Sequence, residues 1–227
     1  MKHLEKPSLF AMAAGAAMLA LTLAPGAGIA APLTVTSYAM NNGAHGSFNY
    51  RDFDYTPCAG VCDTTSAALS GGTGKLTDGV SPSLSWYQYG ERTPWVGWDS
   101  SQGPDQVNPV VTFGWDAKST VKSVTIWVDN TLGAGGVWHP ASVSIGGTNY
   151  LIPLDTIDPA PRAYTFSGLD ITGSSVDLQF FQQASFPWIM IGEVSFDGTA
   201  VPEPASLALL GLGLAGIGLT RWRRQAT

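Results

Sequence analysis

The sequence predicts an all-β fold, an antiparallel β-sandwich between two membrane-targeting segments. Short runs of alternating apolar and polar residues recur through residues 31–200, and Gly, Pro, Asn and Asp separate them. No part of this region keeps the three-to-four-residue apolar spacing of an amphipathic helix. About eight to ten such runs in one domain are typical of a sandwich.

The alternating runs locate the expected strands. Val124, Ile126 and Val128 alternate before the turn at Asp129-Asn130. Val143 and Ile145 lead into Gly146-Gly147 and a second run that ends at Ile152, which predicts a hairpin with a tight glycine turn. Further strands are expected within residues 48–55, 164–166 and 176–180.

The last run changes its phase. Ile189 and Ile191 alternate on one parity, whereas Val194 and Phe196 continue on the other, across Gly192-Glu193. A slip of one residue indicates a β-bulge, which re-aims the side chains that follow it. We therefore expect Glu193 to lie at an irregular point of the last strand.

The N-terminus has the order of parts found in a secretory signal peptide. Lys2 and Lys6 precede an apolar segment from Leu9 to Leu23, and small residues at Gly28 and Ala30 fit a cleavage site after Ala30. The alternative is a buried core helix. We interpret residues 1–30 as a signal peptide, since the apolar segment is shorter than the ~20 residues that span a bilayer.

The charge of the chain argues against nucleic acid as a partner, and its two cysteines bear on the expected disulfide. The chain has 11 basic and 17 acidic residues and a net charge of −6, so a phosphate backbone is repelled and nucleic acid is not an expected partner. Cys58 and Cys62 are the two cysteines, and in an exported protein they predict a small loop disulfide rather than free thiols.

The C-terminus combines three features in a fixed order. Pro202-Glu203-Pro204 precedes an uncharged segment at about residues 205–220, and the chain then carries Arg221, Arg223 and Arg224. At about 1.5 Å per residue this segment reaches roughly 24 Å, somewhat short of a ~30 Å hydrocarbon core. The arginines favour the cytoplasmic side, so the domain is expected to face outward on a weak transmembrane anchor.

This tail, residues 201–227, resembles a PEP-CTERM sorting signal. The resemblance implies processing by an exosortase-type membrane enzyme and a passage from inner-membrane anchoring to the cell surface or the extracellular matrix. An ordinary C-terminal anchor is the alternative interpretation.

Residues 31–200, most clearly 75–198, resemble a discoidin (coagulation factor 5/8 C-type) or galactose-binding-like jelly roll. The segments that carry the resemblance are Leu76-Thr77-Asp78-Gly79, Val110 to Gly114, Val121 to Ile126, Gly136 to Ile145 and Ile191 to Gly198. The terminal disulfide of many discoidin domains is absent. Gln179, Gln182 and Gln183 stand where basic residues are often found in the family.

The resemblance also implies a structural Ca²⁺ between the Asp-Gly loop and a Glu of the last strand. Matched by position, the ligands would be Asp78 and Glu193, carbonyl groups around Lys75 and Val80, and a hydroxyl of Ser81 or Ser83. Calcium takes six to eight oxygen ligands of these kinds. In the alternatives, Lys75 neutralises Glu193, or Glu193 simply faces solvent.

Tryptophans form a second candidate site. Of the eight in the chain, Trp86, Trp95, Trp98, Trp138 and Trp188 stand beside Pro, Gly or loop residues. Loop rings can stack on sugar faces while polar neighbours bind hydroxyls. The ligand-binding prediction therefore comprises Trp95, Trp98, Asp99, Trp138, His139, Gln183 and Trp188. The alternative is that these rings only close the ends of the sandwich.

No familiar enzyme signature is present. The sequence has neither G-x-S-x-G nor H-E-x-x-H, and its cysteines lack the context of a nucleophile. We therefore expect a non-enzymatic exported protein that binds carbohydrate, with exopolysaccharide as the expected ligand. The two other hypotheses are a structural matrix protein that makes protein–protein contacts and a polysaccharide hydrolase or lyase.

Overall fold

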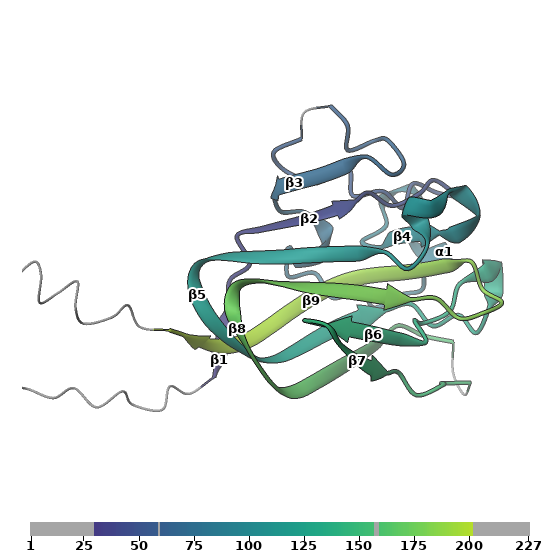
Figure 1. Ribbon diagram of the computed structural model, residues 1–227. Coiled ribbons are helices and arrows are strands. Elements are labelled where there is room, and N and C mark those ends of the chain that lie inside the picture. Colours follow the sequence, from purple (N-terminus) through teal and green to yellow (C-terminus); the bar gives the residue numbers. More distant parts are fainter. Residues whose placement is uncertain (1–29, 59, 157–158, 202–227) are drawn as a thin grey trace, which may run out of the picture.

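The structure is a computed structural model that describes residues 30–58, 60–156 and 159–201 (Figure 1). The strands are β1 (Ala31–Leu33), β2 (Ser37–Asn41), β3 (Ala68–Gly72), β4 (Val96–Asp99), β5 (Val110–Val128), β6 (Ser142–Ile145), β7 (Thr148–Leu151), β8 (Arg162–Phe181) and β9 (Trp188–Ala200). The short helical segments are α1 (Trp86–Tyr89), η1 (Lys75–Thr77), η2 (Gly90–Arg92), η3 (Ser100–Gln102), η4 (Pro104–Gln106) and η5 (Ala134–Gly136). The predicted all-β class is confirmed.

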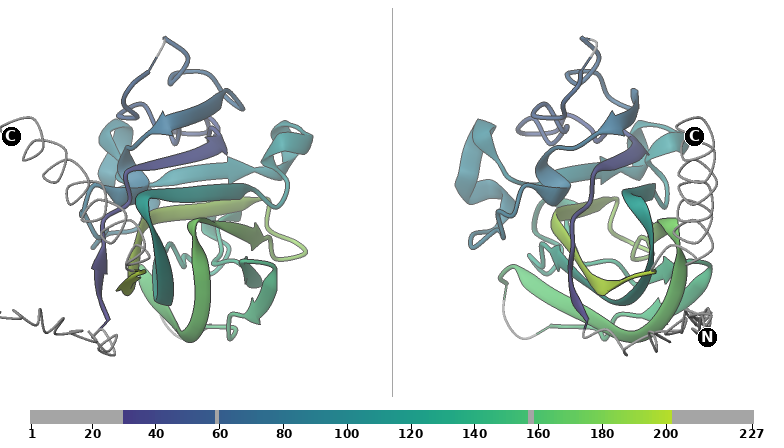
Figure 2. Two further views of the ribbon diagram at one scale, coloured as in Figure 1. Left: turned by 60° about the vertical axis from the view of Figure 1, so that its left-hand side comes forward. Right: turned by 90° about the vertical axis from the view of Figure 1, so that its left-hand side faces the viewer.

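The strands pair antiparallel in the order β1-β9-β5-β8-β6-β7, while β2 joins β3 to β5 and β4 lies along β9. The long strands β5, β8 and β9 bend along their length (Figure 1). The pairing of β5 with β8 shifts register between Gly114 and Ser119 and again between Val121 and Ser123. Such irregularities bend a strand, so one sheet curves over itself around the core, consistent with a sandwich (Figure 2).

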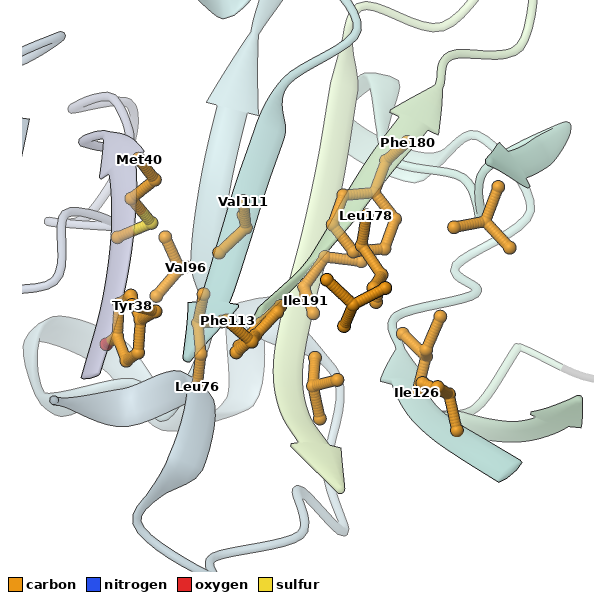
Figure 3. Packing of buried hydrophobic residues seen from close by; sticks show 14 of the residues in the cluster. Tyr38, Met40, Leu76, Val96, Val111, Phe113, Ile126, Leu178, Phe180 and Ile191 are labelled. Carbon is orange, nitrogen blue, oxygen red and sulfur yellow. The ribbon is translucent and has the colours of Figure 1, made fainter. Parts of the chain in front are cut away.

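The core lies inside this curve. Along β5, Val111, Phe113, Val124 and Ile126 have no exposed surface, whereas Thr112 and Thr125 between them are partly exposed. Figure 3 shows the inward side chains of β5 packing against those of neighbouring strands. The period-two pattern of the sequence thus marks the buried face, as expected for a sheet with one face on the core and the other exposed to solvent.

The predicted glycine hairpin is confirmed as β6 and β7. Ser142 pairs with Leu151 and Ile145 with Thr148, which leaves Gly146 and Gly147 as the two turn residues. Their φ angles are 56° and 88°. A two-residue turn with positive φ at both positions matches the right-handed twist of the strands, and glycine adopts it without steric cost.

The predicted bulge in the last strand is also confirmed. Ile126 of β5 pairs with Val194 of β9, but Val128 pairs with Ile191. Two steps along β5 therefore correspond to three along β9, and the extra residue falls at Gly192-Glu193. Glu193 is buried there, which rules out the alternative that it faces solvent.

The strand expected within residues 48–55 is absent. These residues form a loop between β2 and β3, in which Tyr50 and Tyr55 are buried and Phe48 and Phe53 are partly buried. Tyr55 donates a hydrogen bond to the carbonyl oxygen of Tyr38, and its hydroxyl accepts one from the Gly72 amide. Alternation alone did not distinguish a packed aromatic loop from a strand.

The predicted disulfide joins Cys58 to Cys62 in this same loop. The predicted signal peptide, residues 1–30, lies outside the described residues except for Ala30, and the tail after Val201 also lies outside them. Among the residues that the structure describes, no helix is long and apolar enough to cross a membrane.

Candidate functional site

Three strand ends meet at one end of the domain. In the register of β4 and β9, Asp99 stands opposite Trp188. Just beyond β5, the Asp129 amide donates to the carbonyl oxygen of Met190 at 3.1 Å. Val137 forms an isolated parallel bridge with Trp188. The sheet therefore gathers Asp99, Asp129 and Trp188 from distant parts of the sequence.

A cavity of about 240 Å³ opens at this place. Its lining combines aromatic, aliphatic and polar residues. The lining residues are Gly46, Ser47, Tyr50, Trp86, Asp99, Gln102, Gly135, Val137, Trp188 and Met190. The ring of Tyr50 meets that of Trp86 at a centroid distance of 6.0 Å and that of Trp188 at 5.3 Å, with interplanar angles of 80° and 73°. Trp86 and Trp188 remain partly exposed, so each offers ring surface to a ligand.

Glycines allow the two indoles to sit where they do. A Cβ atom on Gly46 would lie 2.8 Å from the Trp188 ring, and one on Gly135 would lie 2.4 Å from the Trp86 ring. Gly135 also has a φ angle of 63°, which other residues adopt only with strain. The loop carrying Gly135 thus packs its backbone directly on Trp86.

The polar side of the cavity is built around Asp99. Its Oδ1 accepts from the amide and the hydroxyl of Ser101, at 3.0 and 2.7 Å, and its Oδ2 accepts from Gln102 Nε2 at 3.0 Å. Gln102 Nε2 also donates to the carbonyl oxygen of His45 at 2.8 Å. The hydroxyl of Tyr50 is buried and has no hydrogen-bond partner among the described residues. The polar side of the cavity therefore offers the Asp99 carboxylate and the Gln102 amide.

Asp129 supports the aromatic wall from behind. It is fully buried, and its Oδ2 accepts a short hydrogen bond from the Trp86 amide, while its Oδ1 has no partner in the described structure. Burial raises the pKa of Asp129 to about 7, because desolvation disfavours the charged carboxylate more than the Trp86 amide stabilises it. Asp129 thus titrates near neutral pH directly beneath Trp86.

Of the predicted ligand-binding residues, the structure brings Asp99 and Trp188 to this cavity. Trp95, Trp98 and His139 have no exposed surface, which corrects their assignment to exposed loops. Trp98 belongs to β4, where its Nε1 donates to the Asn41 carbonyl oxygen at 2.8 Å, and Trp95 Nε1 donates to that of Leu84. Their adjacency to Pro and Gly reflected a strand entering the core rather than a loop tip.

The two remaining predicted residues lie elsewhere. Trp138 is partly buried and packs edge-to-face on Phe186, with ring centroids 4.6 Å apart. Gln183 lines a separate shallow groove together with Ser100, Val107, Gln182 and Phe186. Neither residue lines the aromatic cavity.

Most of the lining residues were missing from the prediction, among them Trp86, Tyr50 and Gln102. Trp86 was counted among the loop tryptophans but received no ligand role, and Tyr50 was assigned to a strand. Gln102 follows Asp99 by three residues in η3, a short turn whose N-cap is Asp99 itself. The Asp-Ser-Ser-Gln order was the available signal, because an Asp before a helical turn accepts from the amide two residues on.

Two of the predicted metal ligands do come together. Glu193 Oε2 accepts from the Gly79 amide at 3.2 Å, and Asp78 Oδ1 accepts from the Val80 amide at 2.8 Å. The pKa of Glu193 is raised to about 8, because it is desolvated and because the Asp78 carboxyl lies beside it. Val80, Ser81 and Ser83 are exposed on the loop that leads to α1. The described residues contain no group of three or more acidic, His or Cys side chains able to hold a metal.

Lys75 does not neutralise Glu193. Its Nζ lies 3.5 Å from the centroid of the Phe53 ring and donates to the Arg51 carbonyl oxygen at 2.9 Å. Lys75 takes part in none of the ion pairs found among the described residues. Burial lowers its pKa to about 8 against the opposing attraction of Asp52, Asp54 and Asp78. The salt-bridge alternative is therefore wrong.

The C-terminal tail matches a known sequence motif. Residues 200–224 match the family model for the PEP-CTERM protein-sorting motif. The predicted sorting signal is thus confirmed at the level of sequence. No curated protein matches the chain significantly.

Several solved structures share similarity with the chain. A truncated AlyQ with CBM32 and alginate lyase domains has 11% identity and a TM-score of 0.41, covering 78% of this chain and 35% of its own. The family 32 CBM of C. perfringens NanJ, in complex with galactose, has 13% identity and a TM-score of 0.28, covering 40% and 67%. An F-lectin from striped bass (Morone saxatilis) serum has 13% identity and a TM-score of 0.33, covering 75% and 80%.

The raised pKa of Asp129 predicts a pH dependence of stability. The folded state keeps this proton up to about pH 7, whereas an ordinary aspartate loses it near 3.8, so the stability contributed by the proton falls as pH rises between these values. Asp129→Asn retains an oxygen acceptor for the Trp86 amide but does not titrate. Urea unfolding from pH 4.5 to 7.5 should show a shallower decline for this variant than for the wild type.

Asp116→Asn, at an exposed position of β5, is the matched control and should keep the wild-type slope. An Asp129→Asn slope equal to that of the wild type would show that Asp129 is ionised throughout this range.

Proposed function

We propose that the protein is an exported carbohydrate-binding protein whose binding site is the cavity bounded by Tyr50, Trp86 and Trp188. The observation that supports this most is the combination of partly exposed indole rings with Asp99 and Gln102 in one hollow. The carbon–hydrogen face of a sugar ring packs on such rings, and its hydroxyls use the polar groups at the edge. The volume of about 240 Å³ suits one sugar residue, being just below the ~300–1,000 Å³ of pockets for larger ligands.

We propose that the protein binds its ligand without catalysing a reaction. The proposed ligand is the cell's own exopolysaccharide. The sorting motif supports a ligand at the cell surface, where such a polysaccharide would lie. A structural matrix protein that contacts other proteins would need no saccharide in this cavity. A hydrolase or lyase would convert a polysaccharide that the proposed module only binds.

Changing Trp188 to Ala tests the site directly. Loss of a stacking ring should weaken saccharide binding at least about tenfold, equivalent to about 1.4 kcal/mol, while changing unfolding far less than a core substitution does. Isothermal titration with oligosaccharides and urea unfolding measure the two quantities.

Trp98→Ala is the contrasting variant, because Trp98 is wholly buried and its loss should cost about 3–5 kcal/mol of stability. Full saccharide affinity in a folded Trp188→Ala protein would place the site elsewhere. Release of shortened or unsaturated sugars by the wild type would instead identify an enzyme.

We further propose that Asp78 and Glu193 hold a structural Ca²⁺. The two carboxyl groups fit this ion, because they lie together and each has a raised pKa, which a bound cation would reverse. Carbonyl groups near Lys75 and Val80, a hydroxyl of Ser81 or Ser83, and water would supply further oxygens. When bound, the ion would tie the loop after η1 to the bulge of β9.

A calcium ion that binds only the folded state stabilises it by about 2.7 kcal/mol at 100 times its Kd. For a domain of this size the melting temperature should rise by roughly 5–10 °C on going from EDTA to millimolar calcium. Glu193→Gln should remove this rise. Identical melting of the wild type in EDTA and in calcium would contradict the site.

For the tail, we propose export, anchoring in the inner membrane and processing by an exosortase-type enzyme. The PEP-CTERM match supports this route, and Pro202, Glu203, Pro204, Arg221, Arg223 and Arg224 carry the motif, although they lie outside the described residues. Replacing the three arginines by Gln should impair retention or processing, because the charges that stop transfer are lost. Unchanged mature mass and unchanged fractionation would count against this assignment.

A further inference from the structure

The charge of the aromatic cavity is one-sided. Its lining contains the carboxylate of Asp99 and no lysine or arginine. Arg51, which follows the cavity residue Tyr50 in the sequence, pairs instead with Asp63, at an N–O distance of 3.0 Å. Lys75 is held against Phe53. A ligand in the cavity therefore meets negative charge without a compensating side-chain cation in its walls.

Hydrogen bonds hold the Asp99 carboxylate in place, but no cationic side chain pairs with it in the described structure. Its oxygens accept three hydrogen bonds, all from uncharged groups of Ser101 and Gln102. Asp99 forms none of the ion pairs of the described chain, and its exposed fraction is only 6%. A carboxylate so far removed from water interacts more strongly with a nearby charge than one at the surface does.

The two partly exposed indole rings add to this preference. Tyr50 is buried and packs edge-on against both Trp86 and Trp188, so it holds the two indoles in place. Aromatic faces carry negative quadrupole charge and attract ammonium groups, with Trp the strongest. Asp129, buried behind Trp86, contributes charge of the same sign when it is ionised. Rings and carboxylates together favour a cation.

We propose that this cavity selects amine-bearing sugars, that is, saccharides with a protonated amino group, over neutral sugars and over uronates. The proposal rests on the proposed function, since it specifies the ligand class of the same site. The sugar ring packs on an indole while its ammonium group lies near Asp99. A uronate carboxylate is repelled by Asp99, and a neutral sugar forgoes the charge–charge attraction.

The test compares matched ligands on the purified wild-type protein. Isothermal titration uses a trisaccharide of glucosamine, its fully N-acetylated counterpart, a neutral galactose trisaccharide, a uronate trisaccharide and choline. The glucosamine trisaccharide should bind at least about tenfold more tightly than each of the others. This advantage should shrink as salt rises, because screening weakens charge attraction.

Asp99→Asn should abolish the advantage of the amine, so that the amine and the N-acetylated trisaccharides bind this variant with equal affinity. Asp105→Asn, an exposed position in η4, is the matched control and should keep wild-type selectivity. The comparison of ligands on the wild type decides the question even where a variant does not fold.

The outcomes separate this proposal from the proposed function. Equal affinity for the amine and the N-acetylated trisaccharide would overturn the selectivity and leave carbohydrate binding standing. Choline binding as tight as that of the amine trisaccharide would overturn it as well, by showing a cation pocket that does not recognise sugar. Absence of binding to every saccharide would overturn both.

Discussion

The pairing of β9 with β5 is the constraint on which the site depends. These strands run together from Ser119 opposite Ala200 to Val128 opposite Ile191, and the backbone contact continues from Asp129 to Met190. Because side chains alternate between faces, a slip of one residue would exchange the buried and the exposed sets. The bulge at Gly192-Glu193 absorbs one residue and so sets which side chains on either side of it face the core. The pairing of β4 with the start of β9 then places Trp188 opposite Asp99.

The sequence predicted those parts of the fold that local patterns encode. The glycine hairpin, the phase change in β9 and the buried face of β5 were visible because a period of two, a Gly-Gly pair and a slip of parity are local signals. The aromatic loop of residues 48–55 misled the prediction, because it alternates like a strand but packs by long-range contacts of Tyr50 and Tyr55. The strands β2 and β3 were not predicted, because each is five residues long and carries only one or two large apolar side chains.

For the site, the sequence indicated which types of residue line the cavity better than it indicated which tryptophans are exposed. Asp99 and Trp188 line the same cavity, whereas Trp95 and Trp98 are buried. Next to Pro and Gly, an indole can enter a core or face a ligand, and the sequence does not contain the long-range packing that decides. Tyr50 lies in the loop between β2 and β3 and Trp86 at the start of α1, and only the folded chain brings them together.

Unpaired acids are a recurring property of the domain, as expected from its excess of acidic residues. Burial raises the pKa values of Asp52, Asp129 and Glu193, and none of the three forms an ion pair within the described chain. A buried carboxyl group without an ion-pair partner either stays protonated or binds a cation from solution. The proposed calcium at Glu193 would supply such a cation.

The central claim is that a saccharide binds against Trp86 and Trp188. Its most direct measurement is NMR of the tryptophan indole protons during titration with the glucosamine trisaccharide. The account predicts that signals of Trp86 and Trp188 shift with saturation, while those of the core residues Trp98 and Trp115 stay in place. Saturable binding that leaves the Trp86 and Trp188 signals unchanged would contradict it.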